Sequence, residues 1–553
     1  MSGANLDSAY LPSSVKVRPM FGQMQDKPLL ISSLLEHAER FHPEVEIISH
    51  TVEGTIDRSN WRTLGARTRR LATWLQAQGV GQGSMVGTLA WNSHRHLELY
   101  FAVMGLGGVL HTINPRLSQE HLAFIINDAE DSMLFYDTTF APLVAKLKEH
   151  VPYVQRFCAM NAGEYEELLA ATPGDPQFRW PRFDERSAAS LCYTSGTTGN
   201  PKGVLSSHRS TVLHSMMVGM PDLMNASANA TILLVVPQFH VNAWGLPYAA
   251  AMTGAKLVLP GPHLDGNSIY QLMKNERVTF AAGVPTVWQM LFQHIDANGL
   301  DPRADLCLRA AVVGGSAAPR AMIERFDREF GAFLLHAWGM TEMSPLGVVC
   351  QLLPKHAALP AEQRYDVQMK QGRAVYGVQL RIVDEDGTVL PHDGVARGRL
   401  MVSGPWIVDR YFKGAGGDIL DADGFFDTGD VATIDAHGYM RITDRSKDVI
   451  KSGGEWISSI DLENTAVSHP GIAMAAVIGV AHPKWQERPL MLCVRKPGAS
   501  VTRDDVLEFL STRVAKWWLP DDVLFVDSLP MTATGKIYKL GLRQQYKDAL
   551  LPA

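Results

Sequence analysis

The sequence predicts an α/β protein built from more than one domain, and three observations lead to this fold class. A chain of 553 residues exceeds the roughly 250–300 residues at which a single hydrophobic core stops growing. Short apolar segments bounded by Gly, Pro or Asn, at 84–92, 230–238 and 255–260, have the composition of buried strands. Helical patterns lie between them, and strands that alternate with helices favour largely parallel sheets.

The expected elements follow one another from the N-terminus. Residues 1–28 are irregular, and a helix is predicted within 29–43, where apolar residues recur at helical spacing on one face. Further helical patterns cover 96–108 and 266–278. From 375 to 445, repeated Asp-Gly and His-Gly dipeptides mark tight turns between strands, which predicts a β-rich subdomain. The block after Asp444 mixes helices and strands again and is expected to form a small domain behind a short hinge.

The composition argues against several classes of protein. A formal net charge of -6 is unlike a general nucleic-acid binder, which usually has a basic face, so no nucleic-acid partner is expected. The five cysteines form no CxxC pair, which fits neither a disulfide scaffold nor a zinc site and suits a reducing compartment. The N-terminus lacks a signal-peptide pattern, and no apolar stretch approaches the roughly 20 residues that span a bilayer. A cytoplasmic protein without an integral membrane segment is therefore predicted.

The sharpest local feature is a glycine-rich loop at 191–204, LCYTSGTTGNPKGV. Glycines let a backbone approach a ligand closely, hydroxyl groups donate hydrogen bonds and a lysine adds positive charge, so such a loop can surround phosphate oxygens. The spacing is not that of a Walker A loop, and the alternative is a flexible surface loop. An apolar strand leads directly into it, which favours phosphate binding by these residues: Thr194, Ser195, Gly196, Thr197, Thr198, Gly199 and Lys202.

The segment YTSGTTGNPKGV, at 193–204, resembles the signature of the acyl-adenylate-forming enzymes, which include acyl-CoA synthetases, peptide-synthetase adenylation domains and luciferases. Further motifs of that family follow in order: PQFHVNAWG (237–245), VVGGSAAP (312–319), HAWGMTE (336–342), FFDTGD (425–430), DRSKDVIKSGGEWIS (444–458) and MTATGKIYK (531–539). Longer stretches such as FHVNAWGLPYAA and KSGGEWISSIDLEN resemble the medium- and long-chain fatty acyl-CoA synthetases, and also a ligase for methylthiopropionate. The resemblance implies a large N-terminal domain, 1–444, with parallel sheets and a β-rich subdomain, and a small mobile α+β C-terminal domain, 448–553. The active site would lie between them.

The resemblance assigns the nucleotide site position by position. Thr194 to Lys202 would clamp the β- and γ-phosphates of ATP, and Thr341 with Glu342 would hold the α-phosphate and Mg²⁺. Trp338 would stack on adenine where many relatives have Tyr, and the aromatic face is retained. The implied ATP and AMP site also includes the adenine loop, the residues after the tryptophan, a ribose-binding carboxylate and an arginine: Gly314, Gly315, Ser316, Gly339, Met340, Asp430 and Arg445.

Catalytic roles are implied in the same way. Lys536 would bridge the carboxylate and α-phosphate oxygens during adenylation, and His240 would lie near the acyl carboxylate and the CoA thiol. A hinge at 445–447, which includes Lys447, would let the C-terminal domain rotate between the two half-reactions. Rotation would bring a glycine-rich turn to the pantetheine arm of CoA: Ser452, Gly453, Gly454 and Glu455.

The acyl pocket is predicted from small and apolar residue types. Trp244 resembles a gate residue of the long-chain branch, and the alternative is a core aromatic residue. Such walls suit a slender alkyl chain of medium or long length and also admit a short thioether acid or an arylalkanoate, because one methylene changes discrimination by only ~1–3 kcal/mol. The predicted walls are Val241, Trp244, Ala281, Gly283, Val284 and Gly315.

Other functions stay open at the level of sequence. An adenylation enzyme that loads a carrier protein is the main alternative, although the motifs favour CoA as the acceptor. A luciferase-like oxygenase and an inactive binding protein are further alternatives, and the presence of Lys202, Glu342, Asp430 and Lys536 argues against the latter. The resemblance also allows for a homodimer. Cationic residues of the last domain are candidates for the CoA nucleotide: Lys484, Arg488 and Lys516.

Overall fold

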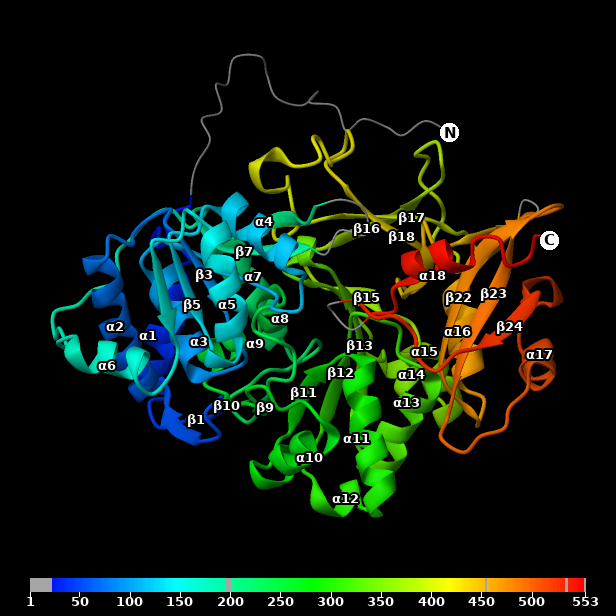
Figure 1. Ribbon diagram of the computed structural model, residues 1–553, viewed down its shortest axis with the longest axis horizontal. Coiled ribbons are helices and arrows are strands. Elements are labelled where there is room, and N and C mark those ends of the chain that lie inside the picture. Colours follow the sequence, from blue (N-terminus) through cyan, green and yellow to red (C-terminus); the bar gives the residue numbers. More distant parts are fainter. Residues whose placement is uncertain (1–21, 195–199, 453–454, 533–535, 552–553) are drawn as a thin grey trace.

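The computed structural model describes residues 22–194, 200–452, 455–532 and 536–551. Their strands form four sheets, and helices cover the large ones (Figure 1). In Figure 1 the first sheet lies at the left, strands of the second sheet with their helices at the lower centre, and the strands of the last part of the chain at the right. The predicted α/β class, with parallel sheets, a β-rich part and a mixed C-terminal part, is confirmed.

Six strands form the first sheet, in the order β6-β5-β3-β4-β7-β8. Its neighbours are parallel except β7 and β8, an antiparallel pair that encloses the glycine-rich loop. The strand predicted at 84–92 is β3. The bounds are β3 Met85–Leu89, β4 Val109–Thr112, β5 Met133–Tyr136, β6 Arg156–Ala159, β7 Ala188–Thr194 and β8 Lys202–Ser207.

Nine strands form the second sheet, in the order β15-β14-β13-β12-β11-β9-β10-β1-β2. The strand predicted at 230–238 is observed as the shorter strand β9. It ends early because Asn92 Nδ2 donates hydrogen bonds to the carbonyl oxygens of Leu234 (2.5 Å) and Val236 (2.8 Å). The strand predicted at 255–260 is β10. The bounds are β1 Glu46–His50, β2 Ile56–Asn60, β9 Thr231–Leu233, β10 Lys256–Leu259, β11 Phe280–Gly283, β12 Ala310–Val313, β13 Phe333–Gly339, β14 Leu346–Val349 and β15 Arg373–Ala374.

Several of the helices begin at polar caps and bury apolar faces against these sheets. Asn60, Ser93 and Ser118 accept hydrogen bonds from the first turns of α2, α3 and α4. The three predicted helices correspond to α1, α3 and α10. The bounds are α1 Ile31–Phe41, α2 Trp61–Ala77, α3 His94–Gly105, α4 Gln119–Ala129, α5 Ala141–Leu147, α6 Glu164–Ala171, α7 His208–Gly219, α8 Val241–Trp244, α9 Leu246–Thr253, α10 Gly266–Asn275, α11 Pro285–Asn298, α12 Pro302–Asp305, α13 Arg320–Arg325, α14 Pro354–Ala357 and α15 Ala361–Gln368.

The predicted β-rich part is an antiparallel sheet in the order β16-β17-β18-β19. Asp-Gly and His-Gly turns connect its strands, as expected: backbone N–H groups bond Asp384, Asp421 and Asp435 side chains at the turns. The bounds are β16 Gln379–Val383, β17 Gly398–Ser403, β18 Phe426–Ile434 and β19 Met440–Arg445.

The last part of the chain has a sheet and a core of its own. Its apolar clusters contain no residue before Ile450. No helix among the described residues is long and apolar enough to cross a membrane. The bounds are β20 Ile450–Ser452, β21 Glu455–Ile457, α16 Ser459–Val467, β22 Ile472–His482, β23 Gln486–Arg495, α17 Arg503–Ser511, β24 Asp522–Phe525 and α18 Lys539–Tyr546.

Candidate active site

A cleft of about 710 Å³ lies where the two large sheets, the antiparallel sheet and the last domain meet. The structure brings most of the predicted site residues to its walls, although they are far apart in the sequence. Their chemical roles stay predictions. The predicted residues that line the cleft are Thr194, Lys202, His240, Val241, Trp244, Gly314, Gly315, Ser316, Trp338, Gly339, Met340, Thr341, Glu342, Arg445, Lys447 and Lys536.

Asp430 lies on β18 directly beside the cleft and is held by two predicted partners. In the antiparallel ladder Asp430 pairs with Arg445 of β19, so their side chains meet: Arg445 Nε lies 2.8 Å from Oδ1. The indole N–H of Trp338, on β13, donates to Oδ2 over 3.0 Å. Burial raises the pKa of Asp430, and the arginine and the indole oppose that shift. A buried carboxylate of this kind gains from further hydrogen-bond donors, such as ribose hydroxyls.

Glu342 lies just after β13 and is 7% exposed. The hydroxyl of Tyr411 donates to Oε1 over 2.7 Å, and the backbone N–H of Val408 donates to the Glu342 carbonyl over 2.8 Å. Burial raises the pKa of this carboxyl group, whereas Tyr411, Arg445 and Lys536 lower it. Sequence reasoning missed Tyr411, which belongs to no motif recognised in the sequence.

Tyr411 also faces the glycine-rich loop. The ammonium of Lys202 lies 4.8 Å from the centre of the Tyr411 ring, within the range of a cation–π contact. One aromatic side chain therefore contacts both the lysine expected to bind phosphate and the glutamate expected to bind metal. Ser195, Gly196, Thr197, Thr198 and Gly199 lie outside the described residues.

Lys536 reaches the cleft from the last domain and is partly buried. Burial and the nearby charge of Arg445 lower its pKa to about 8, while Asp430 and Glu342 favour the charged form. These partners come from three separate motifs. The lysine therefore lies within the electrostatic reach of the acidic and basic residues predicted to bind the nucleotide.

His240 precedes the acyl-pocket turn and lines the same cleft. Burial lowers its pKa to about 4, and the positive charges of Lys536 and Arg116 add to this effect. The imidazole is therefore neutral at physiological pH, so it can accept or donate a hydrogen bond without adding charge. Arg116, which follows β4, is a second residue that sequence reasoning missed.

The predicted acyl-pocket residues separate into two groups. Val241 and Trp244 belong to α8 and line the cleft, where the tip of the indole packs on Gly314: a Cβ atom there would lie 2.8 Å from Cη2. Gly315 lines the cleft too, whereas Val284 does not; Val284 lies next to Gly315, where a Cβ atom would be 3.4 Å from its Cγ1. Ala281 packs instead in the core cluster on the α10 and α11 side, and Gly283 backs onto the ring of Trp288, so neither lines the cleft. Small residues on a strand buried on both faces do not reveal which face they occupy.

Two of the predicted CoA residues, Ser452 and Glu455, are described by the structure and belong to the sheet of the last domain. Ser452 ends β20, is buried and accepts a hydrogen bond from Arg488 over 3.2 Å. Arg488 also donates hydrogen bonds to Asp521 (2.7 Å) and to the carbonyl oxygen of Trp517 (2.9 Å), so it connects segments within the last domain. Glu455 begins β21; Gly453 and Gly454 lie outside the described residues. Lys484 and Lys516 are exposed on the same domain.

Comparisons with known proteins agree with this geometry. Residues 34–412 match the AMP-binding enzyme family and residues 461–536 match the AMP-binding enzyme C-terminal domain. The chain is 51% identical to a 3-methylmercaptopropionyl-CoA ligase of Ruegeria pomeroyi, over 96% of this chain and 100% of the relative. It is 49% identical to a medium-chain-fatty-acid–CoA ligase of Ectopseudomonas oleovorans, over 96% and 98% of the two chains. The solved structure of ATP-bound MatB from Rhodopseudomonas palustris superposes with a TM-score of 0.81 at 27% identity, over 95% and 100% of the chains.

The chain belongs to the AMP-binding enzyme family. The protein is an AMP-forming acyl-CoA ligase: a carboxylic acid reacts with ATP to give acyl-AMP and pyrophosphate, and CoA then displaces AMP to give the thioester. ATP, CoA and a carboxylic acid are therefore its substrates.

Proposed function

We propose that the acid is a medium- or long-chain fatty acid. The observation that carries this proposal is the apolar part of the cleft lining. Several of the lining residues belong to one continuous buried apolar cluster. Those proposed to receive an alkyl chain carry no charge that could pair with a second carboxylate: Met224, Val241, Trp244 and Leu346. The similarity to a medium-chain ligase at 49% identity and to a long-chain ligase of Thermus thermophilus at 45% supports the same class of acid.

A short thioether acid is the second candidate. The indole of Trp244 packs on Gly314, which limits the room beside the apolar lining residues as long as this contact holds. Relatives at 51% identity are named 3-methylmercaptopropionyl-CoA ligases. The alternatives of a carrier-protein-loading enzyme and of an arylalkanoate as the acid stay open to the same test.

A panel of straight-chain acids, with 3-methylthiopropionate and arylalkanoates included, tests the proposal through CoA-dependent AMP formation. Each buried methylene contributes about 0.8 kcal/mol, so kcat/KM is expected to rise about fourfold per carbon until the chain fills the pocket. A maximum at 3-methylthiopropionate, with medium-chain acids poorer, would favour the second candidate. Holo-carrier protein in place of CoA tests the acceptor.

For the adenylation step we propose that Lys536 contacts the attacking carboxylate and the α-phosphate. Its ammonium lies near the charges of Asp430, Glu342 and Arg445, where negative charge develops in phosphoryl transfer. Asp430 would accept hydrogen bonds from ribose, and Trp338, whose indole N–H is already bonded to that carboxylate, would present its face to adenine. Lys202 and the loop before it would contact the terminal phosphates.

Glu342 and Thr341 are proposed to hold Mg²⁺. A carboxylate and a hydroxyl are the oxygen donors that this ion takes, and a buried carboxylate with a raised pKa gains from a cation. The ion, when bound, would neutralise phosphate charge. The protein's own part is to orient the carboxylate, through the hydroxyl of Tyr411.

The second half-reaction is proposed to follow a rotation of residues 448–553 about a hinge at 445–447. The apolar clusters of the last domain begin at Ile450, and β19 and β20 belong to different sheets, which supports a boundary between Arg445 and Ile450. Lys447 lies in the turn between them and lines the cleft. A Lys447→Pro variant is expected to retain pyrophosphate exchange and to lose thioester formation; unchanged CoA consumption would contradict the hinge. The homodimer and the cytoplasmic location stay predictions, for light scattering and cell fractionation to test.

A further inference from the structure

Four consecutive residues with a left-handed backbone lie at the cleft, and the first and last of them, Val241 and Trp244, line it. The φ angles are 45° at Val241, 51° at Asn242, 51° at Ala243 and 57° at Trp244, and Gly245 continues the run at 77°. Left-handed conformations bring Cβ too close to the following carbonyl oxygen, and a β-branched residue is especially disfavoured there. Such a run persists only when its surroundings hold it in place. We call residues 241–244 the left-handed turn.

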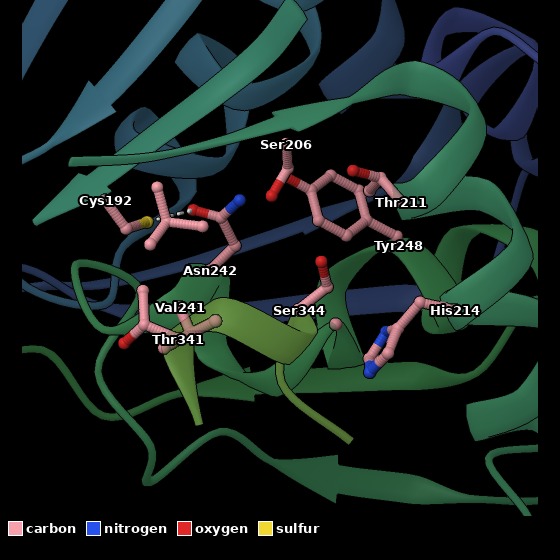
Figure 2. A pocket seen from close by; sticks show the side chains of 11 residues that line it. Cys192, Ser206, Thr211, His214, Val241, Asn242, Tyr248, Thr341 and Ser344 are labelled. Carbon is pink, nitrogen blue, oxygen red and sulfur yellow. Dashed lines mark hydrogen bonds between the residues drawn. The ribbon is translucent and has the colours of Figure 1, made fainter. Parts of the chain in front are cut away.

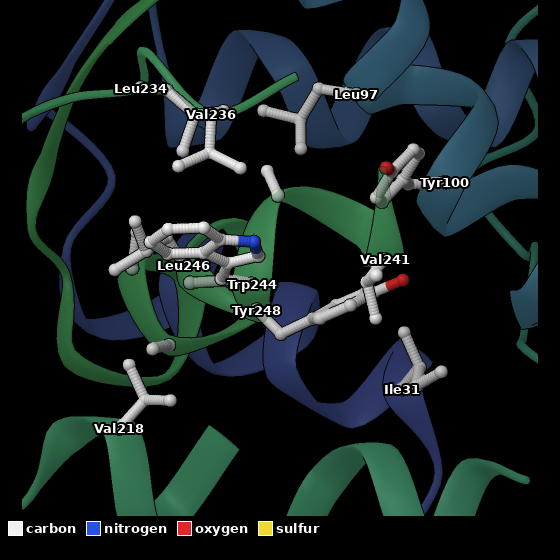
Figure 3. Close-up of a cluster of buried hydrophobic side chains, with 14 of the residues drawn as sticks. Ile31, Leu97, Tyr100, Val218, Leu234, Val236, Val241, Trp244, Leu246 and Tyr248 are labelled. Carbon is white, nitrogen blue, oxygen red and sulfur yellow. The ribbon is translucent and has the colours of Figure 1, made fainter. Parts of the chain in front are cut away.

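Apolar packing confines the two ends of the left-handed turn. Figure 3 shows Trp244 and Val241 among the side chains of a buried cluster that includes Leu97, Leu234 and Tyr248. At the far end, a Cβ atom on Gly245 would lie 2.7 Å from the imidazole of His214, so the backbone fits closely against that ring. Shape alone does not select a left-handed backbone, however, because apolar contacts have no direction.

The directional contacts of the left-handed turn come from the carboxamide of Asn242. Its Nδ2 donates to Ser190 Oγ over 2.8 Å, and its Oδ1 accepts from Thr112 Oγ1 over 3.4 Å. The thiol of Cys192 donates to the same Oδ1 at a sulfur distance of 3.7 Å. The side chain is 7% exposed, so both ends of a buried amide are satisfied. Asparagine also tolerates the left-handed region better than other non-glycine residues.

A cavity of about 10 Å³ lies beside this carboxamide. Figure 2 shows Asn242, Cys192, Ser206, Thr341 and Ser344 around it, with the dashed hydrogen bond from the thiol to Asn242. Its volume is on the order of that needed by one water molecule. The left-handed turn therefore has little empty space to move into, and removal of the carboxamide would enlarge a polar space that opens toward Thr341 of the nucleotide site.

We propose that Asn242 is a positioning residue, which fixes the position of the left-handed turn relative to the nucleotide site. Ser190 and Cys192 belong to β7, which ends at Thr194 where the glycine-rich loop begins. The carboxamide thus connects the left-handed turn, which carries Trp244 and directly follows His240, to the strand that leads to the predicted phosphate-binding loop. Without it, the acyl wall would relax while the nucleotide residues of β13, β18 and β19 keep their own contacts. This inference rests on the proposed function of the cleft as an acyl site.

The test compares three single variants on the best acid of the wild-type enzyme. Asn242→Ala removes the carboxamide, and Ser190→Ala removes the hydroxyl oxygen that accepts a hydrogen bond from its Nδ2. Ala243→Gly is the matched control, because it relieves the left-handed backbone one residue away and keeps the carboxamide. Loss of a buried hydrogen-bonded amide is expected to raise the KM for the acid about tenfold in Asn242→Ala, with the KM for ATP changed less than about twofold. Ala243→Gly should keep both values within about twofold.

Two further readouts separate positioning from a general loss of stability. The double variant Asn242→Ala/Ser190→Ala should raise the acid KM no more than Asn242→Ala alone, because the contact that Ser190→Ala removes is already absent in Asn242→Ala. The preference among chain lengths should broaden in Asn242→Ala, whereas a merely structural defect would lower the melting temperature and leave that preference unchanged. If Asn242→Ala does not fold, Ser190→Ala and Thr112→Val report on the same contacts.

An acid KM and chain-length profile equal to wild type in Asn242→Ala would overturn the proposal, as would equal increases in the KM for acid and ATP. A strictly additive double variant would do the same. A wild-type enzyme that activates none of the acids tested refutes the proposed function instead, so the two failures are distinguishable.

Discussion

The pH dependence of adenylation is the most direct test of the electrostatics of the cleft, because it depends on the charge of Lys536. Burial and the neighbouring charge of Arg445 lower its pKa to about 8, well below that of an exposed lysine. The protonated ammonium is the form that stabilises negative charge on the α-phosphate. Adenylation should therefore decline as pH rises through the pKa, where an ordinary lysine would still be fully charged.

The size of the effect follows from the titration. One pH unit above a pKa of about 8, about a tenth of the lysines stay protonated, so kcat/KM for ATP at pH 9 is expected at about a tenth of its plateau. The profile of kcat should fall at a higher pH than that of kcat/KM, because bound phosphates favour the charged form of the lysine. The imidazole of His240, with a pKa of about 4, should add no acid limb between pH 6 and 7.

The assay is ATP–pyrophosphate exchange at saturating acid, which follows adenylation without CoA. Lys536→Arg is the matched variant, because a guanidinium stays charged across the whole range. Its rate is expected to be lower, since the geometry differs, but its profile should lack the alkaline limb. An identical alkaline limb in Lys536→Arg would assign the titration to another group, and a flat wild-type profile up to pH 9.5 would refute the reasoning.

Three further variants test other contacts. Tyr411→Phe removes the hydroxyl bonded to Glu342, and ATP binding with magnesium, measured by calorimetry, should weaken about fivefold to tenfold; equal affinity would show that the carboxylate needs no such support. Trp338→Phe keeps an aromatic face and loses the hydrogen bond to Asp430, so the KM for ATP should rise about threefold to tenfold and that for CoA should not change. Gly245→Ala places a Cβ at 2.7 Å from an imidazole and at φ +77°, and should lower the free energy of unfolding by about 2 kcal/mol or more. An unchanged denaturant midpoint in Gly245→Ala would mean that the backbone relaxes there.

Much of the fold could be predicted, because its elements have strong local signals. The alternation of apolar segments and helical patterns predicted the parallel sheets, and the Asp-Gly and His-Gly turns predicted the antiparallel sheet. The end of β9 at Leu233 could not be predicted, since the acceptors of the next residues are taken by Asn92, which lies more than a hundred residues away. Contacts with residues far away in the sequence determine such strand boundaries.

The candidate site shows the same division. Motif residues such as Arg445 and Lys536 line one cleft, and Asp430 lies beside it, while their chemical roles stay predictions. Tyr411 could not be found, because a tyrosine outside any recognised motif has no sequence signal and its importance arises from what it contacts. Ala281 and Gly283 were predicted from their size alone, and their strand is buried on both faces, so residue size could not reveal which face they occupy.

Two sets of residues from the last domain are predicted to act in the same cleft, and the structure places only one of them there among the residues it describes. Lys536 lines the cleft, whereas Ser452 is buried against Arg488. Both residues belong to one domain with its own apolar clusters. For Ser452 to replace Lys536 at the cleft, this domain would have to turn as a unit. This is the physical reason for proposing a rotation between the half-reactions.

The junction that such a rotation must open is held by a few polar contacts. Ser458 Oγ donates to the carbonyl of Thr443, and the backbone N–H of Ser459 donates to Asp444 over 2.6 Å. Each contact of this kind stabilises by only about 0.5–3 kcal/mol net, and water can replace it once the junction opens. The apolar clusters on either side stay intact, because none of those of the last domain extends across 445–447. Rotation at this place therefore costs little compared with rotation through a core, and that difference favours a hinge between β19 and β20.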